Sequence, residues 1–158
     1  MGKKGQALSI IIITGYSGAG KTQAVNCMED IGYYCVDNLP PALLPKFVEM
    51  ALQSEGRLDK VALVIDVRGG SFFQDLSSSL HELRVNQIDY QIIFLEAAED
   101  VLVSRFKESR RPHPLGGEGN LLESIRAERN LLEELRGQAS VVIDTSNLPP
   151  RQLKEKLQ

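Results

Sequence analysis

The residue types best suited to chemistry lie together near the amino terminus, in a segment spanning residues 15–22 that reads Gly-Tyr-Ser-Gly-Ala-Gly-Lys-Thr. It fits the pattern G-x-x-x-x-G-K-S/T of a phosphate-binding loop. Glycines permit positive φ angles, so successive backbone N–H groups can point at one anion. Lys21 is placed to reach the outer phosphates, and the Thr22 hydroxyl is placed to bind Mg²⁺, which prefers oxygen ligands. We therefore predict a site for ATP or GTP with Mg²⁺, made by Gly15, Tyr16, Ser17, Gly18, Ala19, Gly20, Lys21 and Thr22.

Two aspartates supply the next candidate groups. Asp66 ends the apolar run 61–65, which is the usual position for the acidic partner of a phosphate loop, and we expect it to hold Mg²⁺ together with Thr22. The alternative is a polar residue that begins a turn. Asp37 also has two interpretations: it is a base that orients a water or a substrate hydroxyl, or Asp37 or Asn38 caps the helix that begins at Pro40.

Basic residues gather in and before the irregular segment 110–120, which contains two prolines and three glycines. We expect Arg105, Arg110 and Arg111 to belong to a flap that closes over the γ-phosphate and offsets its charge. The alternative is a solvated basic helix end, and for His113 this simpler interpretation is preferred. Further along, arginines alternate with glutamates in 123–133, which indicates an exposed helix face with salt bridges, formed by Glu123, Arg126, Glu128, Arg129 and Glu133.

Alternating strand-like and helix-like stretches position these groups. Apolar runs predict strands at 8–14, 33–36, 61–65, 91–95 and 139–143, and helical spacing predicts helices at 23–31, 40–52, 71–84, 98–108, 121–136 and 150–157. Fully apolar strands joined by helices indicate a parallel sheet covered on both faces. The predicted fold is therefore α/β: a kinase-like P-loop NTPase, a three-layer sandwich with a five-stranded parallel sheet. Ligands of such sheets bind at the carboxyl ends of the strands.

Length and composition narrow the class of protein. The 158 residues predict one domain, 1–158, and no apolar run is long enough to cross a membrane. Two cysteines are too few for a disulfide framework, so we expect a reduced, cytoplasmic protein. A net charge of −3 argues against nucleic-acid binding by this chain alone.

Several segments together resemble one known family. Residues 32–40 read Gly-Tyr-Tyr-Cys-Val-Asp-Asn-Leu-Pro, and this stretch with 15–22, 65–68, 94–97, 109–115 and 143–146 resembles the RapZ/YvcJ family of nucleotide-binding proteins, also called RNase adapter proteins. The resemblance covers essentially the whole chain but only about the first half of the family. It implies that 1–158 is the amino-terminal P-loop domain, without the family's carboxyl-terminal domain.

The resemblance also implies an activity and partners. It implies binding and slow hydrolysis of ATP and GTP, with 15–22 as the ATP site and a GTP-associated segment made by Asp66, Val67, Arg68 and Gly69. The family usually carries Asn at the position of Gly69. For the full-length protein, it implies that a small RNA and a ribonuclease are partners through the missing domain.

Three hypotheses follow. The first is a regulatory domain with weak ATPase/GTPase activity, in which Lys21, Asp66, Asp37, Arg110 and Arg111 are catalytic. The second is a small-molecule P-loop kinase in which Asp37 is the acceptor base. The third is a non-hydrolysing, nucleotide-sensing interaction module. The sequence decides neither the preference for adenine or guanine nor the oligomeric state.

Overall fold

A computed structural model of the chain describes residues 8–16, 18–54, 59–66, 70–109 and 121–146, together with Gln152, Glu155 and Leu157. The predicted flap at 110–120, with Arg110, Arg111 and His113, lies outside the described residues. So do Ser17, Val67, Arg68 and Gly69.

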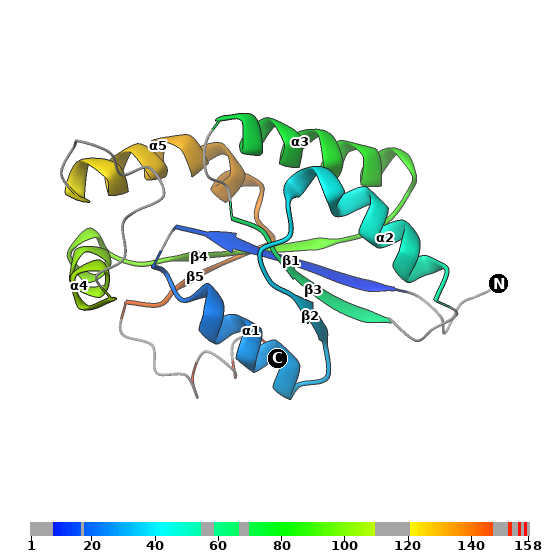
Figure 1. The fold of residues 1–158 in the computed structure, drawn as a ribbon, viewed down its shortest axis with the longest axis horizontal. Helices are drawn as coiled ribbons and strands as arrows, with labels where there is room; N and C mark the ends of the chain where they lie inside the picture. Colours follow the sequence, from blue (N-terminus) through cyan, green and yellow to red (C-terminus); the bar gives the residue numbers. More distant parts are fainter. Residues whose placement is uncertain are drawn as a thin grey trace.

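Five parallel strands form one sheet in the order β2-β3-β1-β4-β5 (Figure 1). Their bounds are β1 (Ser9–Gly15), β2 (Tyr34–Val36), β3 (Lys60–Val64), β4 (Gln91–Glu96) and β5 (Val141–Asp144). The strand β1 is central, between β3 and β4. This position buries the run of isoleucines at 10–13 on both faces of the sheet. The predicted five-stranded parallel sheet is confirmed.

Helices cover both faces of this sheet and make a three-layer sandwich. Their bounds are α1 (Lys21–Asp30), α2 (Leu44–Leu52), α3 (Gly70–Val85), α4 (Glu99–Ser109) and α5 (Leu121–Gln138). Figure 1 shows α2, α3 and α5 above the sheet and α1 below it. Thus α5 and the helix that follows the phosphate loop lie on opposite faces of the sheet.

Two predicted helices differ from the structure or are only partly described. The helix expected at 40–52 begins as the short 3₁₀ helix η2 (Pro41–Leu43) and continues as α2. Of the last predicted helix, 150–157, only Gln152, Glu155 and Leu157 are described, and all three are helical. Within the described residues, no helix is both long and apolar enough to span a bilayer.

The core consists of the strand side chains and the helix faces that cover them. Ile12, Ile13, Leu63, Phe94 and Leu95 are fully buried. The strand register sets the site: Gly15 pairs with Leu95, and Glu96 pairs with Asp144. The carboxyl ends of the three strands β1, β4 and β5 therefore meet at one edge.

Candidate functional site

The glycine-rich loop leaves the end of the central strand. Gly15 is the last residue of β1, and α1 begins at Lys21, so the loop lies in the middle of the carboxyl edge of the sheet. Asp66 follows β3 on one side, while Glu96 and Asp144 end β4 and β5 on the other. The predicted strand–loop–helix setting of the motif is therefore present.

Three glycines of the loop adopt backbone conformations that other residues rarely adopt. The φ angles of Gly15, Gly18 and Gly20 are +148°, +85° and +105°. A Cβ added to Gly15 would lie 2.2 Å from the carbonyl oxygen of Leu95, because the loop starts hard against β4. Gly20 is the N-cap of α1 and contributes no capping side chain. The positive end of α1 therefore faces the loop without a side-chain cap, as an anion site requires.

Lys21 lies across the loop. Its Nζ donates hydrogen bonds to the carbonyl oxygens of Gly15, at 3.1 Å, and Tyr16, at 3.0 Å. It also lies 3.4 Å from Oδ1 of Asp66, and the two side chains are 12% and 27% exposed. The structure thus joins the predicted lysine, at the start of α1, and the predicted aspartate, which follows β3.

Arg105 of α4 links the phosphate loop to the end of β5. It projects from α4 and donates from Nη1 to Gly18 O, at 2.9 Å, and to Thr145 Oγ1, at 3.1 Å. Its Nη2 donates to Thr145 O at 2.7 Å, and the Thr145 hydroxyl donates to Ala19 O at 2.6 Å. Arg105 is therefore not a solvated helix end: it contacts the loop backbone, while the rest of the predicted flap, 110–120, lies outside the described residues.

On the α5 side of the loop, the Tyr16 side chain lies between the sheet and the helix. The residue is 3% exposed, and its ring meets Phe94 edge-to-face with centroids 5.1 Å apart. Arg129 of α5 places Cζ 5.2 Å from the centroid of the Tyr16 ring. Burial raises the pKa of Tyr16, and the nearby Arg129 offsets only part of that increase. The phenol is therefore protonated at neutral pH.

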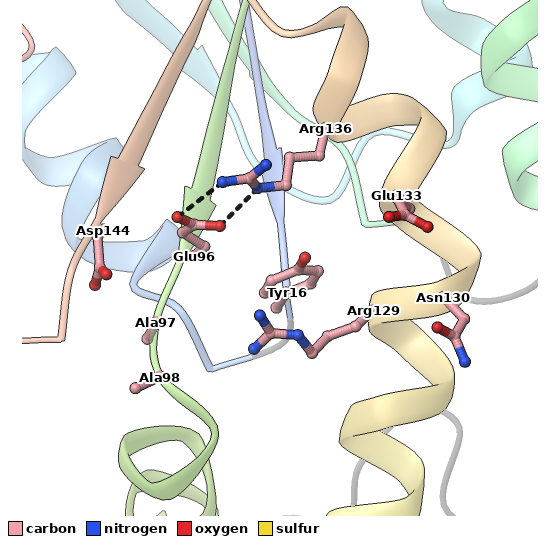
Figure 2. Close-up of a pocket in the computed structure, with 9 residues that line it drawn as sticks. All are labelled: Tyr16, Glu96, Ala97, Ala98, Arg129, Asn130, Glu133, Arg136 and Asp144. Atoms are coloured by element: carbon pink, nitrogen blue, oxygen red, sulfur yellow. Dashed lines mark hydrogen bonds and ion pairs between the residues drawn. The ribbon is translucent and has the colours of Figure 1, made fainter.

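A cavity of about 390 Å³ opens beside Tyr16. Figure 2 shows Arg129 and Arg136 reaching from α5 on either side of the Tyr16 ring, with Glu96 and Asp144 across from them on β4 and β5. Arg136 makes two bonds to Glu96, from Nε at 2.7 Å and from Nη2 at 3.2 Å. The cavity is lined by Tyr16, Glu96, Ala97, Ala98, Arg129, Asn130, Glu133, Arg136 and Asp144.

Residues 8–158 match the family described as the RapZ-like N-terminal domain. The chain belongs to this family. The match includes the phosphate loop, the strands that position it and α5.

Relatives of this RapZ-like N-terminal domain are longer than the chain. It is 69% identical over 157 residues to a "nucleotide-binding protein" of Syntrophomonas wolfei, covering 99% of the chain and 53% of that protein. It is 55% identical over 150 residues to one of Clostridium perfringens, covering 95% of the chain and 51% of that protein. The chain therefore spans about half the length of the curated relatives it matches.

Solved structures with the same fold include two kinases. Shikimate kinase from Bacteroides thetaiotaomicron superposes with a TM-score of 0.63 at 17% identity, covering 96% of this chain and 97% of that chain. A sugar kinase from Janibacter gives 0.64 at 18% identity, covering 95% and 92%. At this identity the likeness establishes the fold alone, and it confirms the predicted kinase-like P-loop sandwich.

The prediction that α5 has an exposed face with salt bridges is wrong at Glu128 and Arg129. Arg126 does form an exposed pair with Glu99 of α4, at 3.1 Å. Glu128, however, is only 2% exposed, and Arg129 lies over Tyr16. The sequence held a signal for Glu128, because it falls at helical spacing on the same buried stripe as Ile125, Leu132 and Leu135.

The helix-cap interpretation of Asp37 and Asn38 is also wrong. The N-cap positions of η2 and α2 are Pro40 and Leu43, and neither helix receives a side-chain cap. Asn38 instead takes a positive φ of 59°, which turns the chain after β2. Asp37 is exposed and follows β2, the edge strand two places from β1. Of the other predicted site residues, Ser17, Val67, Arg68, Gly69, Arg110 and Arg111 lie outside the described part of the chain.

Proposed function

We propose that this chain binds a nucleoside triphosphate with Mg²⁺ in the loop 15–22 and hydrolyses it slowly, as the regulatory domain of a longer protein. The observation that carries the proposal is the position of Lys21. Its ammonium group is held at the loop by two carbonyl oxygens and faces Asp66, at the edge where ligands of parallel sheets bind. The names of the relatives, "nucleotide-binding protein", support the same ligand class.

In this proposal the loop backbone and Lys21 hold the phosphates. The residues are Gly15, Tyr16, Ser17, Gly18, Ala19, Gly20 and Lys21. Thr22 and Asp66 fit the oxygen donor set of Mg²⁺, which usually takes one or two protein ligands and completes its shell with phosphate oxygens and water. When bound, the metal would neutralise charge on the phosphates.

The remaining predicted residues act around this centre. Asp37, exposed after β2, is proposed to orient a water; Arg110 and Arg111 are proposed to offset phosphate charge; and Asp66, Val67, Arg68 and Gly69 are proposed as the GTP-associated segment. For the full-length protein we propose that the nucleotide state controls contacts to a small RNA and a ribonuclease made by the other half.

Replacing Lys21 tests the proposal directly. We expect Lys21→Ala to weaken the binding of ATP and of GTP by at least about 100-fold, or about 2.7 kcal/mol, because the variant loses the ammonium group that the carbonyl oxygens of Gly15 and Tyr16 hold at the loop. Titration calorimetry with each Mg²⁺–nucleotide measures the change. Lys46→Ala, on the exposed side of α2, is the matched control and should bind as the wild type does.

Unchanged affinity in a folded Lys21→Ala protein would contradict the site. A phosphate-release assay on the wild-type protein separates slow hydrolysis from nucleotide sensing. Phosphate release into water supports slow hydrolysis, whereas tight binding without release supports a nucleotide-sensing module.

A further inference from the structure

We propose that the cavity between Tyr16 and α5 is a second binding site, which takes a small anion that carries several hydroxyl groups, such as a sugar acid or a sugar phosphate. The cavity shares Tyr16 with the phosphate loop but lies on the α5 face of the sheet, whereas α1 lies on the opposite face (Figures 1 and 2). The inference does not depend on nucleotide binding, since occupancy can be measured without nucleotide.

The walls of the cavity suit a small polar molecule. Its volume of about 390 Å³ is within the range of small-molecule sites, roughly 300–1,000 Å³. The walls come from three parts of the fold: the loop after β1, the ends of β4 and β5, and one side of α5. A site assembled from segments this far apart in sequence is held rigid by the sheet, so its polar groups keep fixed positions.

Arg129 is the group that selects an anion. Within the described part of the chain, Arg129 contacts the face of the Tyr16 ring and forms no hydrogen bond or ion pair. A cation–π contact uses none of the N–H donors of the guanidinium, so these donors can still meet a carboxylate or phosphate in pairs. Arg129 is half-buried, so solvent screens that interaction only in part.

The opposite wall supplies acceptors for hydroxyl groups. Glu96 and Arg136 bond each other at both oxygens, so this pair contributes no net charge. Glu133 and Asp144 remain, with the Asn130 amide. Hydrogen bonds from Ser146 lower the pKa of Asp144, so its carboxylate is an acceptor at neutral pH. An anion without hydroxyls would face these carboxylates unfavourably, whereas a hydroxylated one can donate to them.

Tyr16 links this cavity to the phosphate loop. Its ring forms the floor under Arg129, and its carbonyl oxygen accepts a bond from Lys21 Nζ at 3.0 Å. A ligand that engages Arg129 therefore acts on the residue that also holds the loop lysine. We expect occupancy of the cavity to change nucleotide affinity, in either direction.

Binding of two defined probes to the full chain tests the site. Gluconate and glucose 6-phosphate are titrated at millimolar concentrations into the isotope-labelled chain, without nucleotide, and amide shifts are followed by NMR. We expect saturable shifts at Tyr16, Ala98 and Asn130, and weaker effects from inorganic phosphate. Arg129→Gln should weaken binding by at least about tenfold. Arg126→Gln, in the same helix but 61% exposed and paired with Glu99, should leave it unchanged.

Lys21→Ala distinguishes the two sites. Probe binding that survives Lys21→Ala and fails in Arg129→Gln supports the second site, whatever happens to nucleotide binding. The proposal is overturned if neither probe saturates, if Arg129→Gln binds normally, or if Lys21→Ala abolishes probe binding, since the probes would then occupy the phosphate loop. Inorganic phosphate binding as well as the probes would overturn the assignment to hydroxylated ligands. Should Arg129→Gln fail to fold, Glu133→Gln gives a second test: it removes one carboxylate that faces the anion, so inorganic phosphate should bind more tightly than to the wild type, and unchanged binding of all three ligands would overturn the proposal.

Discussion

At the scale of single residues, the ion pair between Lys21 and Asp66 is weak. The atoms are 3.4 Å apart, and the Asp66 side chain is 27% exposed. Partly exposed pairs of this kind contribute only about 0–1 kcal/mol, because water screens them. Little free energy therefore opposes the separation of this one ion pair, which the proposed binding of phosphate by Lys21 and of Mg²⁺ by Asp66 would require.

Asp66→Asn tests that exchange. The amide keeps the size of the side chain but removes its charge, so we expect the dependence of nucleotide affinity on Mg²⁺ to fall and phosphate release to drop by about tenfold or more, which is about 1.4 kcal/mol. Calorimetry with and without Mg²⁺ and a phosphate-release assay measure the two effects. Asp89→Asn, at the opposite edge of the sheet just before β4, is the control. Identical Mg²⁺ dependence in the Asp66→Asn and wild-type proteins would remove Asp66 from the metal site.

At the scale of elements, α4 and the end of β5 form a brace for the phosphate loop. Arg105 bonds Gly18 and Thr145, and Thr145 bonds Ala19. Phe106, next in α4, lies so close to Gly18 that a Cβ there would sit 3.1 Å from its ring. These contacts hold Gly18 and Ala19 in place, so that part of the loop needs little further ordering when a ligand binds.

Arg105→Lys tests the brace while keeping the charge. An ammonium group cannot reproduce the forked contacts of the guanidinium, so bonds to Gly18 or Thr145 must be lost. We expect the free energy of unfolding to fall by about 1–3 kcal/mol and nucleotide affinity to fall with it. Urea denaturation and calorimetry measure both. Arg126→Lys, an exposed arginine on α5, should change neither; if the Arg105 variant behaves like this control, the brace has no energetic role.

The helices and strands can be predicted from the sequence because each depends on residues that are close together in the chain. Apolar runs such as 10–13 identify buried strands, and the glycine pattern of 15–22 identifies a turn that must pass close to other backbone, which the Gly15 contact to Leu95 explains. The positions of Asp66 and Asp37 follow from the rule that parallel strands end at one edge.

Contacts between distant segments could not be predicted in this way. Arg105 and Gly18 are 87 residues apart, and nothing near Arg105 in sequence indicates that its guanidinium turns toward the loop. Arg129 belongs to a charged segment typical of an exposed face, and only the packing of α5 on the sheet brings it over Tyr16. The cavity is formed by residues that are distant in sequence, so no local pattern predicts it.

At the scale of the whole molecule, the phosphate loop connects the central strand β1, the neighbouring strand β4 and the helix α1. It continues the central strand, it is hydrogen-bonded to β4 through Tyr16 N and Leu95 O at 3.1 Å, and it begins α1. Through Lys21 and Asp66 it also contacts the segment after β3. A ligand held by this loop is therefore bound by the folded state and not by the unfolded chain.

Thermal unfolding tests this coupling. A ligand that binds only the folded state at 100 times its Kd stabilises it by about 2.7 kcal/mol. For a chain of this length about 1 kcal/mol moves Tm by roughly 2–4 °C, so we expect saturating Mg²⁺–nucleotide to raise Tm by roughly 5–10 °C. Differential scanning calorimetry measures the shift for ATP and GTP separately. Adenosine and guanosine, which lack phosphates, should give almost none, and neither should either nucleotide with Lys21→Ala. An equal shift from the nucleosides would place the binding energy in the base and not in the loop.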